Sequence, residues 1–251
     1  MKLDCVLTAV NENPLYIDFI PIFIKTWKKL YPDIDVKIIL IAERIPDKFL
    51  EYKKNIILFK PIENVLTSFT SQYIRLLYPC ILNYKNGVMI TDMDILPMNS
   101  TYYTENIKLY DNTNFIYYRG DICLCDREIA MCYNVATPLV WKEIFNISSI
   151  DDIRLRIKEV SDNNVIIEGQ GNIGWCLDQI NLFKKVVAWN KKTNKFIRLD
   201  EKTTGFNRLD RVHSINILNL KLIKEGKYSD YHCHRPFKKY KDLINQIYEA
   251  L

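Results

Sequence analysis

Residues 68–98, SFTSQYIRLLYPCILNYKNGVMITDMDILPM, contain the pattern that decides the fold. Apolar side chains recur at helical spacing over residues 67–82, and Thr67 or Ser68 can cap such a helix. Residues 87–90 are then apolar without interruption, which predicts a short strand buried on both faces. A helix that leads into a buried strand is one unit of an alternating α/β fold.

Two carboxylates, Asp92 and Asp94, directly follow the predicted strand. In α/β sheets, ligands bind beyond the carboxyl ends of the strands. Two acids separated by one residue can share a hard divalent cation, which prefers oxygen ligands and leaves coordination positions open for substrate phosphates. The alternative is that both side chains end the strand and contact only water. Their position after a buried strand favours the metal site.

The preceding part of the chain repeats the alternation. Residues 5–10, 36–41 and 55–59 are apolar runs that predict three further strands. Turn-forming residues at 11–14 separate the first run from a helical pattern that ends near Leu30. Strands that are apolar throughout and separated by helices predict an α/β fold with a mostly parallel central sheet and helices on both faces.

The second half of the chain is less regular. It predicts helices at residues 138–145, 150–160, 175–185 and 239–251, and short strands at residues 186–189, 196–199 and 215–218. Trp175 and Trp189 are expected in the core. No repeat or linker divides the chain, so we expect one domain over residues 1–251, with a nucleotide-binding half at 1–100 and an acceptor- and sugar-binding half at 101–251.

The composition is that of an ordinary globular protein, with 48% hydrophobic and 26% charged residues. The formal net charge of +5 is spread over scattered Lys and Arg residues, so no nucleic-acid partner is expected. The N-terminal residues include Asp4 and no long apolar run, and no stretch of about 18 apolar residues follows. We therefore expect no transmembrane segment and a cytoplasmic location, in the host cell if the protein is viral.

The seven cysteines are odd in number and lack the spacing of a disulfide scaffold, which favours a reducing compartment. Cys123 and Cys125 could share a zinc ion with the histidines and cysteine at residues 232–234. That spacing matches no usual structural zinc pattern, so a zinc site is not expected.

The order of the helix motif and the paired acids resembles glycosyltransferase family 8, which includes glycogenin and lipopolysaccharide galactosyltransferases. In that family a helix ending Y-x-R-L-L-x-P precedes a strand and a D-x-D-I-L element. The matching residues here are Tyr73, Arg75, Leu76, Leu77 and Pro79, followed by Asp92, Asp94, Ile95 and Leu96. Small viral and bacterial enzymes with a D-x-D element and a terminal H-x-x-R-P, here residues 232–236, also look similar.

Further stretches follow the order of the same family. The segment LTAVNENP resembles the family's first strand and loop. The resemblance implies that the nucleotide contacts Thr8, Ala9, Val10 and Asn13. The segment GWCLDQINLF resembles the family's D-Q-D-x-L-N element, which implies that Asp178 and Gln179 lie beside the transferred sugar as the catalytic residues.

The segment YHCHRPF resembles the end of the family's C-terminal motif. The resemblance implies that His232, with His234 as the alternative, completes a Mn²⁺ or Mg²⁺ site with Asp92 and Asp94. Donor binding is implied for Arg75, Asp92 and Arg235, where the two arginines add positive charge beside the diphosphate.

The resemblance implies a GT-A fold and a metal-dependent glycosyltransferase, most simply a hexosyltransferase. The donor would be a nucleoside-diphosphate sugar, with UDP favoured, and the acceptor a glycan, protein or lipid-linked hydroxyl that the sequence does not identify. Family 8 points to retention and the viral-like enzymes to inversion, so the anomeric outcome stays open, as does the oligomeric state. Two rivals remain: a nucleotidyltransferase of similar fold, and an inactive nucleotide-sugar-binding module.

Overall fold

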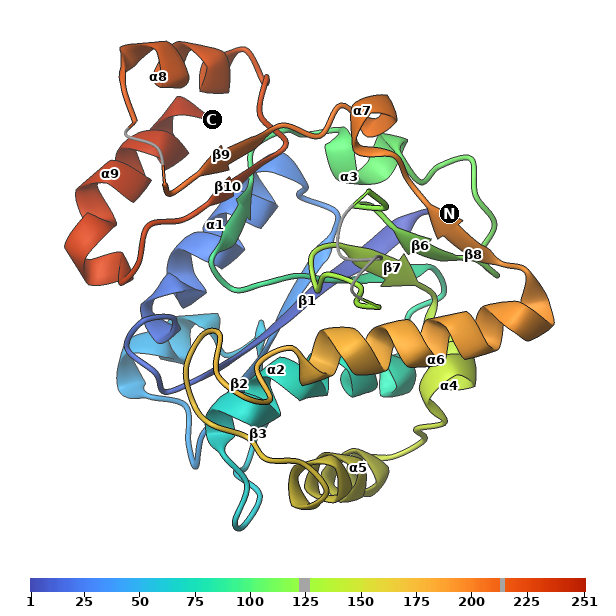
Figure 1. Ribbon diagram of the computed structural model, residues 1–251. Coiled ribbons are helices and arrows are strands. Elements are labelled where there is room, and N and C mark those ends of the chain that lie inside the picture. The colour runs from blue at the N-terminus through green and yellow to red at the C-terminus, as the bar shows by residue number, and fades with distance from the viewer. Residues whose placement is uncertain (122–126, 213–214) are drawn as a thin grey trace.

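The computed structural model describes residues 1–121, 127–212 and 215–251. Within them a seven-stranded sheet has the order β3-β2-β1-β4-β7-β6-β8 (Figure 1). Its strands are β1 (Leu3–Asn11), β2 (Asp35–Ile41), β3 (Ile56–Phe59), β4 (Gly87–Ile90), β6 (Phe115–Tyr117), β7 (Asn134–Ala136) and β8 (Phe196–Arg198). Strands β3, β2, β1 and β4 are parallel, β7 is antiparallel to both neighbours, and β8 is parallel to β6. The predicted mostly parallel sheet is confirmed.

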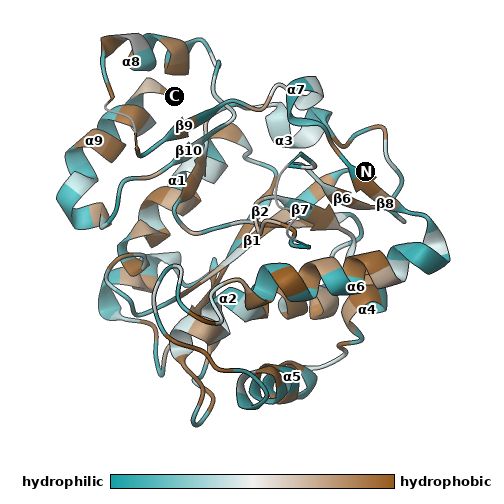
Figure 2. Ribbon diagram, in the orientation of Figure 1, coloured by the Kyte–Doolittle hydropathy of each residue, from teal (hydrophilic) through white to brown (hydrophobic). Residues whose placement is uncertain are grey.

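Successive residues of β1 supply two hydrophobic cores, one on each face of the sheet. Val6 and Val10 belong to one core, whereas Cys5, Leu7 and Ala9 belong to the other. Apart from Thr8, residues 5–10 of the strand are apolar, because helices cover both faces of the sheet there. Figure 2 shows the hydrophobic residues concentrated along β1 and β2.

Helices cover both faces of this sheet, as predicted. The core that contains Val6 also contains residues of α1 (Ile20–Leu30) and α9 (Phe237–Ala250). The other core contains residues of α2 (Thr67–Leu77), α4 (Pro138–Phe145), α5 (Ile150–Asp162) and α6 (Leu177–Thr193). Helices α2 and α6 carry residues of the site described below.

A smaller sheet brings the C-terminal part of the chain beside the paired acids. Strand β10 (Asp230–His232) lies between β5 (Ile95–Pro97), to which it is antiparallel, and β9 (Arg208–Asp210), to which it is parallel. The backbone N–H of Cys233 donates to the carbonyl of Asp94 at 2.8 Å. Helices α8 (Ile217–Lys224) and α9 lie on the same side of the molecule in Figure 1.

A buried polar cluster joins the two sheets. The Arg208 guanidinium donates to both carboxylate oxygens of Asp230, at 2.9 and 2.7 Å, and Tyr133 O–H donates to the same carboxylate. Asp230 is fully buried. A carboxylate satisfied by a bidentate guanidinium and a phenol holds β9 and β10 firmly against the segment that precedes β7.

Short elements complete the described chain: η1 (Ile17–Phe19), η2 (Asp47–Tyr52), η3 (Tyr78–Ile81), α3 (Tyr102–Glu105) and α7 (Glu201–Thr204). No helix in the described ranges combines the length and apolar character needed to cross a bilayer. Strands from before and after residue 100 share the seven-stranded sheet, so the two halves pack as neighbours in one sheet.

Three local predictions were wrong. Residues 186–189 lie inside α6, where Leu182, Val186 and Trp189 are buried at helical rather than alternating spacing. Residues 215–218, predicted as a strand, instead lead into α8, which begins at residue 217. The N-cap of α2 is Leu66, whose side chain makes no capping hydrogen bond, and Thr67 is already helical.

Candidate active site

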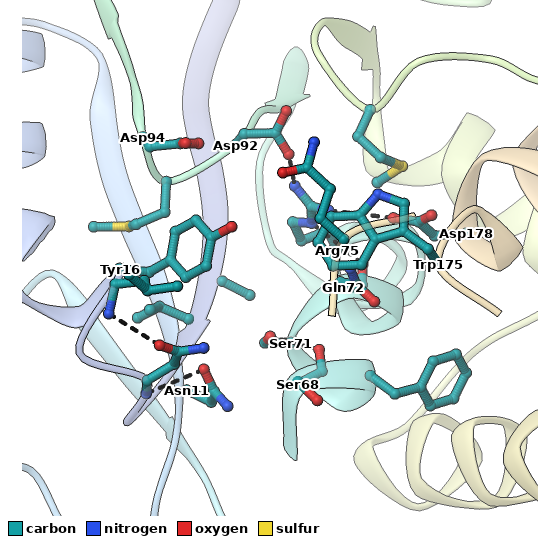
Figure 3. A pocket seen from close by; sticks show the side chains of 18 of the residues that line it. Asn11, Tyr16, Ser68, Ser71, Gln72, Arg75, Asp92, Asp94, Trp175 and Asp178 are labelled. Atoms are coloured by element: carbon teal, nitrogen blue, oxygen red, sulfur yellow. Dashed lines mark hydrogen bonds and ion pairs between the residues drawn. The ribbon is translucent and has the colours of Figure 1, made fainter. Parts of the chain in front are cut away.

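A cavity of about 530 Å³ opens beyond the carboxyl ends of β1 and β4. Its walls come from the segment after β1, one face of α2, the paired acids, residues 166–179, and the ends of β9 and β10. Figure 3 shows Asp92 and Asp94 at one side of this space, with Arg75, Trp175 and Asp178 beside Asp92. The volume is in the range that natural small-molecule sites use.

Arg75 connects the two acidic elements that the sequence placed far apart. Its guanidinium lies in a short ion pair with Asp92 and at 3.2 Å from Oδ2 of Asp178, and it donates to the Thr91 carbonyl at 3.2 Å. Arg75 is 6% exposed and Asp178 is 4% exposed. Arg75 is therefore a buried, paired cation and not a solvated surface charge.

Asp178 stands in the first turn of α6, at the cavity wall. Burial raises the pKa of its carboxyl to about 6, although the Arg75 guanidinium pulls the pKa in the opposite direction. Desolvation disfavours the ionised carboxyl more than one shared guanidinium can offset. Asp178 can therefore change protonation state close to neutral pH, a property found at many catalytic positions.

Asp94 faces a different set of partners. Its Oδ2 lies 2.8 Å from Arg211 Nη1, 3.3 Å from Arg235 Nε and 3.6 Å from His232 Nε2. Burial alone would raise the pKa of this carboxyl, but His232 and the two arginines hold it below the usual value. Asp94 is therefore an ionised carboxylate in a strongly positive environment.

His232 is oriented by a second carboxylate. Its Nδ1 lies 3.1 Å from Oδ2 of Asp210, and the other oxygen of Asp210 accepts from the Val212 backbone N–H at 3.1 Å. This contact fixes the ring so that Nε2 is directed toward Asp94, where it could bind a metal ion. Histidines that bind metals are commonly held by a carboxylate in this way.

The predicted metal ligands fit a divalent cation in part. A separation of 3.6 Å between Asp94 Oδ2 and His232 Nε2 suits two ligands that each bind one ion at ~2.1 Å. Asp92, in contrast, is turned toward Arg75 (Figure 3). Across the described ranges, no group of three or more His, Cys, Asp or Glu residues is already assembled around one point. Asp94 and His232 thus have the separation of two ligands of one cation, although two guanidiniums contact Asp94. Asp92 would have to share its carboxylate with Arg75.

The structure separates the remaining predicted residues into two groups. Those that line the cavity are Ala9, Val10, Asn13, Arg75, Asp92, Asp94, Asp178, Gln179, His232 and Arg235. Thr8 is buried within the sheet, and its hydroxyl has no hydrogen-bond partner among the described residues. His234 is bonded through Nδ1 to Tyr231 O–H at 2.6 Å and packs against the Tyr240 ring, so His232 alone of these two histidines lines the cavity with Asp94. Cys123 and Cys125 lie outside the described residues.

Several residues of the cavity were missed from the sequence. Gln72 lines it from α2 and could have been found, because it stands one helical turn before Arg75 on the same face. Trp175 was expected in the core but lines the cavity, whereas Trp189 is buried as predicted. Tyr16 and Arg211 belong to no recognised motif. The tertiary structure brings Tyr16 to Arg235 and Arg211 to Asp94.

Comparison with known proteins agrees with this geometry at the level of the fold. No protein-family model and no curated protein sequence matches the chain. The solved structure of the galactosyltransferase LgtC with donor and acceptor sugar analogues is similar, with a TM-score of 0.51 and 12% identity over 98% of this chain and 96% of that one. The glycosyltransferase GlyE of Streptococcus pneumoniae TIGR4 has a TM-score of 0.54 at 14% identity, and this chain covers 60% of its length. The chain has the GT-A glycosyltransferase fold, as predicted.

Proposed function

We propose that this protein is a metal-dependent glycosyltransferase that moves a sugar from a nucleoside-diphosphate sugar to a hydroxyl acceptor. The observation that carries the proposal is the Arg75 bridge between Asp92 and Asp178 at the wall of the cavity. Arg75 and Asp178 are both buried charged groups, and removing such groups from water is costly even when they are paired. The GT-A fold supports sugar transfer in general, and the preference for UDP rests on the resemblance of the motifs.

The donor would lie along the carboxyl ends of β1 and β4. Ala9, Val10 and Asn13 line the part of the cavity next to β1, where they would contact the base and ribose. The diphosphate would then lie near Arg235, and the sugar near Arg75 and Asp178. This order follows the usual placement of nucleotides beyond the strand ends of α/β sheets.

The residues that would hold Mn²⁺ or Mg²⁺ are Asp94 and His232, with Asp92 as the shared third ligand. Such an ion would supply charge neutralisation for the departing diphosphate. Arg235 would add a fixed positive charge, because Tyr16 O–H, Gln170 and Asp94 all hold its guanidinium in place. Fixed charges require no reorganisation during the reaction, which is what makes them effective.

Asp178 and Gln179 would act on the sugar rather than on the nucleotide. The Asp178 carboxylate can accept a proton or stabilise positive charge that develops at the sugar, and Arg75 keeps it in place. Trp175 lines the same region and offers an aromatic face on which a sugar ring can stack.

Neither rival function fits this site as well. A nucleotidyltransferase would need a glycine-rich, basic phosphate loop after its first strand, whereas residues 11–14 are Asn-Glu-Asn-Pro. Against an inactive binding module stands the buried Asp178 carboxyl, which lines the cavity and is paired with the buried Arg75, because buried paired acids in cavity walls are typical of catalytic sites.

The experiment is to incubate the protein with a panel of nucleotide sugars, including UDP-glucose and UDP-galactose, with Mn²⁺ and then with EDTA, and to measure released nucleoside diphosphate. We expect Mn²⁺-dependent release from at least one donor. Release of pyrophosphate from nucleoside triphosphates would identify a nucleotidyltransferase instead. Nucleotide-sugar binding without any release would identify the inactive module.

A further inference from the structure

The Asp94 carboxylate has two arginine partners in addition to His232, the residue proposed as its fellow metal ligand. Arg211, Arg235 and His232 all approach the same oxygen, Oδ2, and Arg211 is the nearest at 2.8 Å. A divalent cation bound to that oxygen would repel a guanidinium in contact with it. One of the two arginines must therefore move when the cation binds.

The two arginines differ in how firmly they are held. The Arg235 guanidinium also bonds to Tyr16 O–H and to Gln170 Oε1 at 3.3 Å, and it lies over the Tyr16 ring at 4.9 Å. Arg211, within the described part of the chain, bonds otherwise to the Cys233 carbonyl alone, through a long contact of 3.5 Å. Arg211 is thus the arginine that can leave Asp94.

The cavity offers Arg211 a second position, in which its guanidinium could bind an anion. Arg211 stands directly after β9 and lines the same cavity as Asp92, Asp94 and Arg235. A guanidinium released from a carboxylate binds phosphate oxygens well, because its planar fork matches either anion. The donor diphosphate proposed above is the anion that would reach it.

We propose that Arg211 is the exchangeable counter-ion of Asp94: it neutralises the carboxylate in the empty site, gives it up when the divalent cation binds, and then binds the donor diphosphate. This inference rests on the proposed function, since it concerns the cation and the nucleotide of that site. Such an exchange would couple binding of the divalent cation to binding of the nucleotide through the Arg211 side chain. Arg211 opposes binding of the cation alone and favours binding of the nucleotide once the cation is present.

The test compares Arg211→Gln with the wild-type protein by calorimetry. Removal of the competing guanidinium should strengthen binding of Mn²⁺ alone about tenfold, whereas binding of UDP at saturating Mn²⁺ should weaken about tenfold, as expected for loss of one charged hydrogen-bonding group. Arg211→Lys keeps the charge and should recover part of the UDP affinity. The matched control is Arg154→Gln on α5, whose guanidinium bonds to the Lys60 and Pro61 carbonyls, and it should change neither affinity.

Opposite changes in the two affinities cannot come from a general loss of structure, which would weaken both. If Arg211→Gln weakens both or changes neither, while the wild-type protein releases UDP from a donor in the presence of Mn²⁺, the role of Arg211 is overturned and the proposed function stands. If the wild-type protein releases UDP without Mn²⁺ and binds no Mn²⁺, the metal site and the role of Arg211 both fail. If no donor is turned over, the proposed function fails as well.

Discussion

Asp92 and Asp94 are two residues apart in the sequence, yet they belong to opposite sides of the site. Asp92 faces α2 and α6, where one guanidinium, that of Arg75, serves two carboxylates. Asp94 faces the small sheet, where two guanidiniums approach one carboxylate. Guanidiniums therefore outnumber the carboxylate at Asp94, whereas carboxylates outnumber the guanidinium at Arg75.

This difference assigns the two sides to different parts of a nucleotide-sugar donor. A diphosphate matches the positive Asp94 side, and a sugar that develops positive charge at its reacting carbon matches the Asp92 side. The proposed function thus separates substrate binding from chemistry within one D-x-D element. Four substitutions or conditions, ordered by expected effect, test that separation.

The largest effect is expected from Asp94→Asn. Loss of the carboxylate would leave His232, Arg211 and Arg235 without their shared counter-ion and the cation without its best-placed ligand. We expect turnover to fall at least ~10³-fold, since a metal contributes several kcal/mol of charge stabilisation, together with loss of Mn²⁺ binding in calorimetry. Asp162→Asn, an exposed residue paired with Lys158 on α5, is the matched control. Near-wild-type turnover of Asp94→Asn would contradict the assignment of Asp94 to the metal.

The next largest effect is expected from Asp178→Asn, on the Asp92 side. Here kcat should fall ~10²–10³-fold, because a positioned acid–base or charge-stabilising group is lost, while the affinity for UDP with Mn²⁺ stays nearly unchanged. Single-turnover rates and UDP calorimetry on the same preparation separate the two quantities. If kcat falls by less than about tenfold, Asp178 has only a structural role as the partner of Arg75.

A smaller effect is expected from Asp210→Asn, because Asp210 is not among the residues that line the cavity and contacts His232 instead. Without the carboxylate that holds Nδ1–H, His232 can rotate or change tautomer, so Mn²⁺ affinity should fall ~10–100-fold. The rate at saturating Mn²⁺ should recover, which a direct role in chemistry would not allow. Unchanged Mn²⁺ affinity would show either that His232 is not a metal ligand or that Asp210 does not set its orientation.

The smallest effect is the pH dependence that follows from Asp178. Its pKa is raised to about 6, so the carboxyl gains a proton as the pH falls through that value. If the carboxylate is the working form, kcat should fall about tenfold for each unit below pH 6, and the residual rate of Asp178→Asn should lack this limb. A flat profile from pH 5 to 8 in the wild-type protein would show that ionised Asp178 is not required.

Much of the Asp92 side could be predicted from the sequence, because its parts are local. The strand before Asp92 and the helix that carries Arg75 are set by apolar periodicity within about thirty residues. The D-Q pair at Asp178 was found by resemblance, although its burial against Arg75 was not. The strands predicted before residue 100 are all present, whereas residues 186–189 were misassigned because a short apolar run fits a strand or a helix equally well.

The sequence by itself determined the α/β alternation, the parallel core and the position of two acids at a strand end, because these follow from periodicity and from the direction of the strands. Only the tertiary structure decided which partners each acid has. Pairing of β10 with β5 and β9 brings Arg211, Asp210 and His232 to Asp94 across more than a hundred residues, and no local pattern encodes such a contact. Burial then decided the charge states, since desolvation raises the pKa of Asp178 while positive neighbours lower that of Asp94.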